Sequence, residues 1–254
     1  IFANSMPILH DVVTHKNKLP DFIQLPIEKF ACDFDCILLS EHSRQMFDAF
    51  NSTMDCHVLP FPLFYLGDRP DLDEQKKMGE PSCPDGKKIR VGCIGNLRYE
   101  KGVETILDAL HWKEFKNIEV TIAGHNFIDL KIIESEYPSV SFRLDFLDPI
   151  EYDEIFSSLD YCFLIYDKGV SNSGIIYDAL ARNVIPIVSD IPLFRESPFS
   201  AGFLFAGNIS DLRNTLEAID AEEYRADIAP LHDVKSSYVE HTKSIYFNFI
   251  ESIK

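Results

Sequence analysis

Two short loops carry the residues of this chain that are best suited to binding an anion. The first, GNLRYEKG (95–102), follows an apolar run and places Arg98 and Lys101 after Gly95. The second, SNSG (171–174), separates an apolar run from a helical pattern. A helix N-terminus favours an anion, and cations beside it complete a phosphate site. A solvated basic turn with a glycine cap explains the first loop equally well.

Asp178 lies one helical turn beyond the second loop. A carboxylate at this place can accept two hydrogen bonds from a vicinal diol such as ribose. It could instead be a partner of the helix dipole, and Ser173 could be no more than an N-cap. Two anion-ready loops with a carboxylate nearby fit a nucleoside diphosphate better than any one of these features alone.

The elements that must position these loops form an alternating series from residue 89 onward. The apolar patterns predict strands at 89–95, 118–124, 140–147, 160–167, 184–190 and 202–206, and helices at 103–115, 129–137, 152–159, 174–183 and 209–219. Short, almost wholly apolar strands that alternate with helices are typical of a parallel sheet covered on both faces. Ligands of such α/β sheets bind at the carboxyl ends of the strands, where both loops fall.

The first part of the chain repeats the alternation over fewer elements. We expect strands within 6–15, 35–40 and 56–64, with helices at 21–34 and 41–50. A polar stretch rich in proline and glycine follows and has no periodicity, which indicates a linker. The expected domains are therefore 1–66, a linker at 67–88, a larger domain at 89–237 and a final helix at 238–254.

Composition excludes several classes of function. The 254 residues include 24 Lys and Arg against 41 Asp and Glu, a formal charge of −17, so a nucleic-acid partner is not expected. The longest apolar runs are far shorter than the ~20 residues of a transmembrane helix. Six scattered cysteines indicate buried free thiols in a reducing compartment, hence a cytoplasmic protein. Cys32 and Cys36 lack a second pair at metal spacing, so no zinc site is expected.

Three segments in this order, GNLRYEKGVETILDAL, VTIAG and SNSGIIYDALARNVIPIVSD, resemble the donor domain of retaining GT-B glycosyltransferases of the group 1 type. The resemblance implies an α/β fold of GT-B type, a Rossmann-like doubly wound parallel sheet with a partial second Rossmann-like domain. It also implies a donor diphosphate site without a metal or other cofactor. Its residues would be Gly95, Asn96, Arg98, Lys101, Ser173 and Gly174, the last two through backbone amides.

The family has a second signature, a pair of glutamates near the donor. The glutamate that binds ribose corresponds to Asp178, a shorter acid. The glutamate near the donor sugar falls at Ser171, so this chain departs from the family at the sugar end. We therefore treat Ser171 and Asn172 as candidates for contact with the sugar.

The first domain resembles the closing part of the family's acceptor-binding domain. ILHDVVTH looks like the strand that ends in a histidine facing the donor sugar, which implies a catalytic His10 and a second candidate in His15. The family's opening strands have no counterpart in this chain, so either the chain is truncated or its acceptor domain is reduced. The helix at 238–254 looks like the one that crosses back to the first domain.

The resemblance implies transfer of a sugar, with retention, from a nucleotide-diphosphate sugar to a glycan or lipid-linked acceptor, in surface polysaccharide synthesis. The missing N-terminal region leaves open a peripheral contact with the inner face of the membrane. One alternative is a non-catalytic module of the same fold that binds a nucleotide sugar or a partner, favoured by the missing strands and by Ser171. The other is a sugar-phosphate enzyme such as an epimerase, for which we find no trio of carboxylates.

Overall fold

The computed structural model of the chain describes residues 8–9, 36–38, 43–45, 48, 56–60, 88–127, 136–166, 173–221 and 229–252. The chain divides into two compact units. One comprises Ile1–Tyr65, Lys168–Gly174 and Ser236–Lys254, and the other Leu66–Asp167 and Ile175–Lys235. The larger unit holds every strand of the main sheet and the loop at 95–102 after its first strand.

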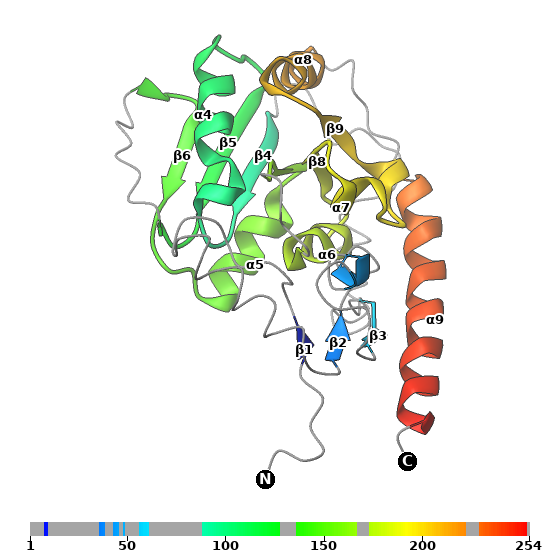
Figure 1. Cartoon of the computed structure of the whole chain (residues 1–254). Coiled ribbons are helices and arrows are strands. Elements are labelled where there is room, and N and C mark those ends of the chain that lie inside the picture. The colour runs from blue at the N-terminus through cyan, green and yellow to red at the C-terminus, as the bar shows by residue number, and fades with distance from the viewer. Residues whose placement is uncertain are drawn as a thin grey trace. The chain divides into compact units, whose positions relative to one another are not determined.

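A six-stranded parallel sheet forms the centre of the larger unit, in the order β6-β5-β4-β7-β8-β9 (Figure 1). Its strands are β4 (Ile89–Ile94), β5 (Ile118–Ala123), β6 (Val140–Arg143), β7 (Tyr161–Leu164), β8 (Ile185–Ser189) and β9 (Leu204–Ala206). β7 and β8 are buried at every position, as expected of central strands covered on both faces. The order confirms the doubly wound parallel sheet predicted from the sequence.

The strand order reverses between β4 and β7, which are neighbours in the sheet although two other strands separate them in the chain. The chain first builds outward from β4 through β5 to β6, then returns to the other side of β4 and continues through β7 to β9. In sheets of this kind the crevice at such a reversal is the usual ligand site. The loop at 95–102 follows β4 directly, and α6 is the next described helix after β7 in the chain.

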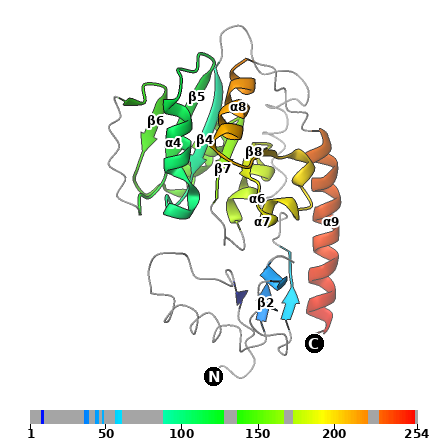
Figure 2. The same cartoon turned by 45° about the horizontal axis from the view of Figure 1, so that its top comes forward.

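Helices cover both faces of the sheet. α4 (Val103–His111) and α8 (Ile209–Asp220) pack against each other on one face, as Figure 2 shows. The segment after α4 is also tied to α8, because Lys113 pairs with Glu217 and Asn117 donates two hydrogen bonds to Asp220. α5 (Pro149–Ser158) and α6 (Gly174–Ala181) lie side by side and are joined through Arg182 and Asp153. Buried Phe156, Ile176 and Leu180 anchor α5 and α6 in the core.

Many element boundaries differ from the predicted ones: α4 stops at His111 and not at 115, and β6 and β7 stop at Arg143 and Leu164 and not at 147 and 167. α5 begins at Pro149 instead of residue 152, because Asp148 caps it by accepting bonds from the amides of Ile150 and Glu151. A short helix, α7 (Pro192–Arg195), was not predicted; its four residues are too few for a periodic pattern. The last helix, α9 (Ala229–Ser252), starts nine residues before the predicted 238. The helix predicted at 129–137 lies largely outside the described residues.

The smaller unit contains a three-stranded parallel sheet in the order β1-β2-β3. Its strands are β1 (Ile8–Leu9), β2 (Cys36–Leu38) and β3 (Cys56–Val58). Leu38 and Leu59 are buried, and the His57 ring contacts Phe249 of α9 at a centroid distance of 5.2 Å. The short parallel strands agree with the predicted Rossmann-like character of this part of the chain.

The described residues also include three of the cysteines and the helices to be compared with a membrane span. Cys56, Cys93 and Cys162 are buried free thiols. None of the helices in the described part of the chain combines the length and the apolar character that crossing a bilayer requires.

Candidate functional site

Two glycines bring the carboxyl ends of β4 and β5 into close contact. Gly95 and Gly124 follow these strands directly and have φ angles of +107° and +135°, which residues with side chains rarely adopt. A Cβ atom on Gly124 would lie 1.9 Å from the carbonyl oxygen of Gly95, so no side chain fits there. The Gly95 amide donates to the carbonyl of Ala123, which ties the two loops together at the sheet edge.

Lys101 extends toward the same place from the loop after β4. It ends a short 3-10 helix, η2 (Tyr99–Lys101), and its Nζ lies 3.4 Å from the hydroxyl of Tyr166. A Cβ atom on Gly95 would lie 3.8 Å from this Nζ and 2.8 Å from Cδ1 of Ile175, in the first turn of α6. The Lys101 ammonium and the start of α6 therefore both lie beside Gly95, at the reversal of the sheet.

Arg98 has a different environment from Lys101. Its guanidinium lies over the ring of Phe127 at 5.6 Å from the centroid and pairs with Glu100 at 3.7 Å. The Arg98 side chain is 38% exposed, and Asn96 is exposed as well. Arg98 therefore connects the loop after β4 to the loop after β5, where Phe127 and His125 make an edge-to-face contact.

Gly174 is the first residue of α6, as the sequence predicted, and Ser173 before it is buried. Ser171, Asn172, His10 and His15 lie outside the described residues, so the structure places none of them. The structure thus brings together Gly95, Lys101 and the first turn of α6 on the nucleotide side of the predicted site.

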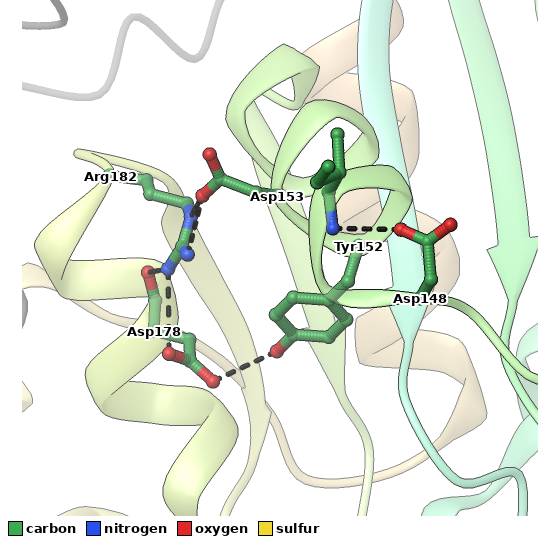
Figure 3. A network of polar contacts seen from close by, with 6 residues as sticks. Asp148, Tyr152, Asp153, Asp178 and Arg182 are labelled. Atoms are coloured by element: carbon green, nitrogen blue, oxygen red, sulfur yellow. Dashed lines mark hydrogen bonds and ion pairs between the residues drawn. The ribbon is translucent and has the colours of Figure 1, made fainter.

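Asp178 takes part in a polar network between α5 and α6 (Figure 3). Its Oδ2 accepts a hydrogen bond of 2.8 Å from the Tyr152 hydroxyl, and its Oδ1 lies 3.4 Å from the guanidinium of Arg182. Arg182 also donates to Asp153, with a shortest distance of 2.7 Å. The Asp178 side chain remains 23% exposed, so the network leaves part of its carboxylate open to solvent.

The environment of this network fixes the protonation state of the tyrosine. Burial raises the pKa of Tyr152, and the negative charge and hydrogen bond of Asp178 raise it further. The phenol is therefore a hydrogen-bond donor over the whole physiological pH range. Burial also raises the pKa of Cys93, to about 11, although the nearby Lys101 opposes the shift.

Four side chains that contact the predicted residues have no recognisable motif for this role in the sequence: Phe127, Tyr152, Tyr166 and Arg182. Tyr166 and Phe127 each stand two or more residues past the end of a strand, a position that could have drawn attention to them. Tyr152 and Arg182 lie 26 and four residues from Asp178 in the chain. Only the packing of α5 against α6 brings Tyr152 to Asp178.

No family model matches the chain, and no curated protein matches it. Several solved structures, in contrast, are similar to it. HepE from Anabaena in complex with UDP and glucose has a TM-score of 0.70 at 14% identity, over 98% of this chain and 70% of that one. The sucrose-phosphate synthase of Thermosynechococcus elongatus has a TM-score of 0.66 at 16% identity, over 94% of this chain and 65% of that one.

OtsA in its apo form is also similar, with a TM-score of 0.64 at 14% identity. The chain spans 63% of the length of that structure, and 93% of the chain takes part in the match. These proteins have the GT-B fold. The similarity therefore confirms the fold class predicted from the sequence, an α/β fold of GT-B type.

Proposed function

We propose that this chain binds a nucleotide-diphosphate sugar and belongs to a glycosyltransferase that transfers the sugar to a glycan or lipid-linked acceptor. One observation carries the proposal. Lys101, Gly95 and the first turn of α6 lie together where the strand order of the sheet reverses. A cation, a backbone without side chain and a helix N-terminus are the groups that recognise a diphosphate.

Transfer releases a nucleoside diphosphate, so negative charge develops on the phosphate oxygens as the glycosidic bond breaks. Lys101, Arg98 and the backbone amides at Ser173 and Gly174 would stabilise this charge. The sheet reversal supports this assignment, because both loops follow strands that adjoin it. HepE, one of the similar structures, binds UDP and glucose.

The finer parts of the proposal rest on the sequence resemblance. They are retention at the anomeric carbon, a catalytic role for His10, and synthesis of a surface polysaccharide. His15, Ser171 and Asn172 remain candidates for contact with the sugar, and Asp178 for contact with ribose. We further propose that the charge is stabilised by protein groups alone, in which case EDTA leaves the rate of transfer unchanged.

Titration of the chain with UDP-, GDP- and dTDP-sugars by saturation-transfer NMR tests the donor site. We expect saturation transfer to the sugar nucleotide in the wild type and its loss in the Arg98→Ala, Lys101→Ala double variant. The control is Lys243→Ala, Arg213→Ala, which removes the same charges from α9 and α8. Equal binding by the double variant and the wild type would contradict the proposal.

A non-catalytic module that binds a nucleotide sugar is the second candidate. Ser171 stands where the family has a glutamate, which favours this candidate. A transfer assay on the full-length gene product separates the candidates. Donor binding without turnover of the sugar nucleotide would favour the module.

A further inference from the structure

The polar network between α5 and α6 indicates what kind of ligand group Asp178 can take. Asp153 and Asp178 share one guanidinium, that of Arg182, so the three side chains carry a net charge of −1. A second anion at this place would be repelled by the excess negative charge. A neutral group that donates hydrogen bonds to Asp178, such as a hydroxyl, is not repelled. This division of charge assigns the diphosphate to Lys101 and a diol to Asp178.

Tyr152 and Arg182 together occupy only part of the acceptor capacity of the Asp178 carboxylate. An ionised carboxylate offers about four acceptor positions. The Tyr152 hydroxyl occupies one on Oδ2 at 2.8 Å, and Arg182 approaches Oδ1 at 3.4 Å. Acceptor positions on both oxygens remain, and the Asp178 side chain is partly exposed. Figure 3 shows the Asp178 carboxylate between the Tyr152 hydroxyl and the Arg182 guanidinium.

The two donors also restrict rotation of the Asp178 side chain. Arg182 is itself held, because it donates to Asp153 and to the backbone carbonyl of Asp178 at 3.0 Å. Only 11% of the Arg182 side chain is exposed. A carboxylate held by two fixed donors on different helices loses little rotational freedom when a ligand binds, which favours affinity.

We propose that Tyr152 is a positioning residue that holds Asp178 in the orientation that receives a ribose diol, with Arg182 as its second support. The inference rests on the proposed function, since it requires a nucleotide ligand. Tyr152 acts through Asp178, to which its hydroxyl donates. The phenol stays protonated and donating, so its effect is constant over the physiological pH range.

Isothermal titration with paired ligands tests the inference. UDP, GDP and ADP are titrated first against the wild-type chain, and the tightest is then compared with its 2′-deoxy and 3′-deoxy analogues. We expect loss of at least one ribose hydroxyl to weaken wild-type binding about tenfold, the effect of one hydrogen bond to a charged group. In Tyr152→Phe the same loss should weaken binding only about two- to threefold.

Two further variants separate positioning from general damage. Tyr137→Phe, in a tyrosine that packs on His111 and Phe142 away from this network, should keep the tenfold discrimination. In an Asp178→Asn background, Tyr152→Phe should cause no further change, because its effect passes through the carboxylate. Should Tyr152→Phe fail to fold, Arg182→Lys, which keeps the charge but loses the planar fork, replaces it with the same expected loss of discrimination.

The outcomes distinguish this inference from the proposed function. If the wild type binds none of the three nucleoside diphosphates, the proposed function is wrong and the inference with it. If the wild type binds and discriminates ribose hydroxyls, but Tyr152→Phe discriminates equally well, only the inference is overturned. Reduced discrimination in Tyr152→Phe with full discrimination in Tyr137→Phe supports it.

Discussion

The ammonium of Lys101 lies 3.4 Å from the hydroxyl of Tyr166, a contact between the loop after β4 and the second residue past the end of β7. These two strands are neighbours at the place where the sheet reverses its order. The ammonium also lies 5.3 Å from the centroid of the Tyr166 ring, which gives it an apolar support on one side. Tyr166 thus directs the cation toward Gly95.

Removal of the Lys101 charge is expected to weaken binding of a nucleoside diphosphate by about 10- to 100-fold, because a hydrogen bond to a charged group contributes about 1.5–3 kcal/mol. Tyr166→Phe keeps the ring and removes only the hydroxyl, so its effect should be smaller, a few-fold. Isothermal titration of Lys101→Ala and Tyr166→Phe measures both. Lys243→Ala on α9 is the control, and an equally large effect of this variant would contradict the assignment.

Arg98 should contribute through its position over Phe127. Phe127→Ala removes the ring under the guanidinium and leaves the charge of Arg98 in place. Arg98→Ala removes the guanidinium together with its charge. We expect Arg98→Ala to weaken nucleoside diphosphate binding about tenfold and Phe127→Ala by less. Arg213→Ala is the matched control, because Arg213 lies over Trp112 in the same way, at 5.5 Å. The test is titration at low and high salt, where the contribution of Arg98 should shrink as salt rises.

The two glycines at the strand ends, Gly95 and Gly124, are expected to contribute to the stability of the fold. Gly95→Ala should lower the free energy of unfolding by about 1–3 kcal/mol, because φ is +107° and the new methyl group meets Ile175. Gly124→Ala should cost more, because its methyl group meets the backbone of Gly95. Urea denaturation measures both.

Gly207→Ala provides the control for these glycines. Its methyl group would lie 3.0 Å from the side-chain oxygen of Asp211, which can move, so the cost should stay below about 1 kcal/mol. A cost for Gly124→Ala no larger than that for Gly207→Ala would show that the sheet edge yields easily.

Stability should fall at alkaline pH because of the buried thiol of Cys93. The folded pKa is raised from 9.0 to about 11, so the thiol ionises more readily in the unfolded chain. Its contribution is fully present below the unfolded pKa and is lost as pH rises from about 8.5 to 11, at up to about 1.4 kcal/mol per pH unit. Burial raises the pKa of Cys162 in the same direction.

Urea denaturation of the wild type and of Cys93→Ala between pH 7 and 10.5 measures this dependence. The variant should show a shallower fall in the free energy of unfolding than the wild type. Parallel curves would mean that Cys93 does not contribute to the pH dependence.

The alternation of strands with helices and the start of α6 at Gly174 were predictable from local sequence patterns. Apolar runs bounded by glycine, as at Gly95 and Gly124, identify strands that end at one edge, because chain conformation there depends mainly on nearby residues. The early start of α5 was missed, although Asp148 and Pro149 form a recognisable N-terminal signal. The short α7 and the long α9 depend on tertiary packing, which overrides weak local patterns.

The α/β fold class was predictable from the alternation of apolar strands with helices. Residue type and spacing were enough to select Lys101 and Asp178 as candidates, because they set which chemistry a loop can support. The sequence could not determine their partners. Tyr166 reaches Lys101 across 65 positions, and Tyr152 reaches Asp178 across 26 positions. Such contacts arise only when β7 pairs with β4 and α5 packs against α6, since hydrogen bonding depends on distance in space and not along the chain.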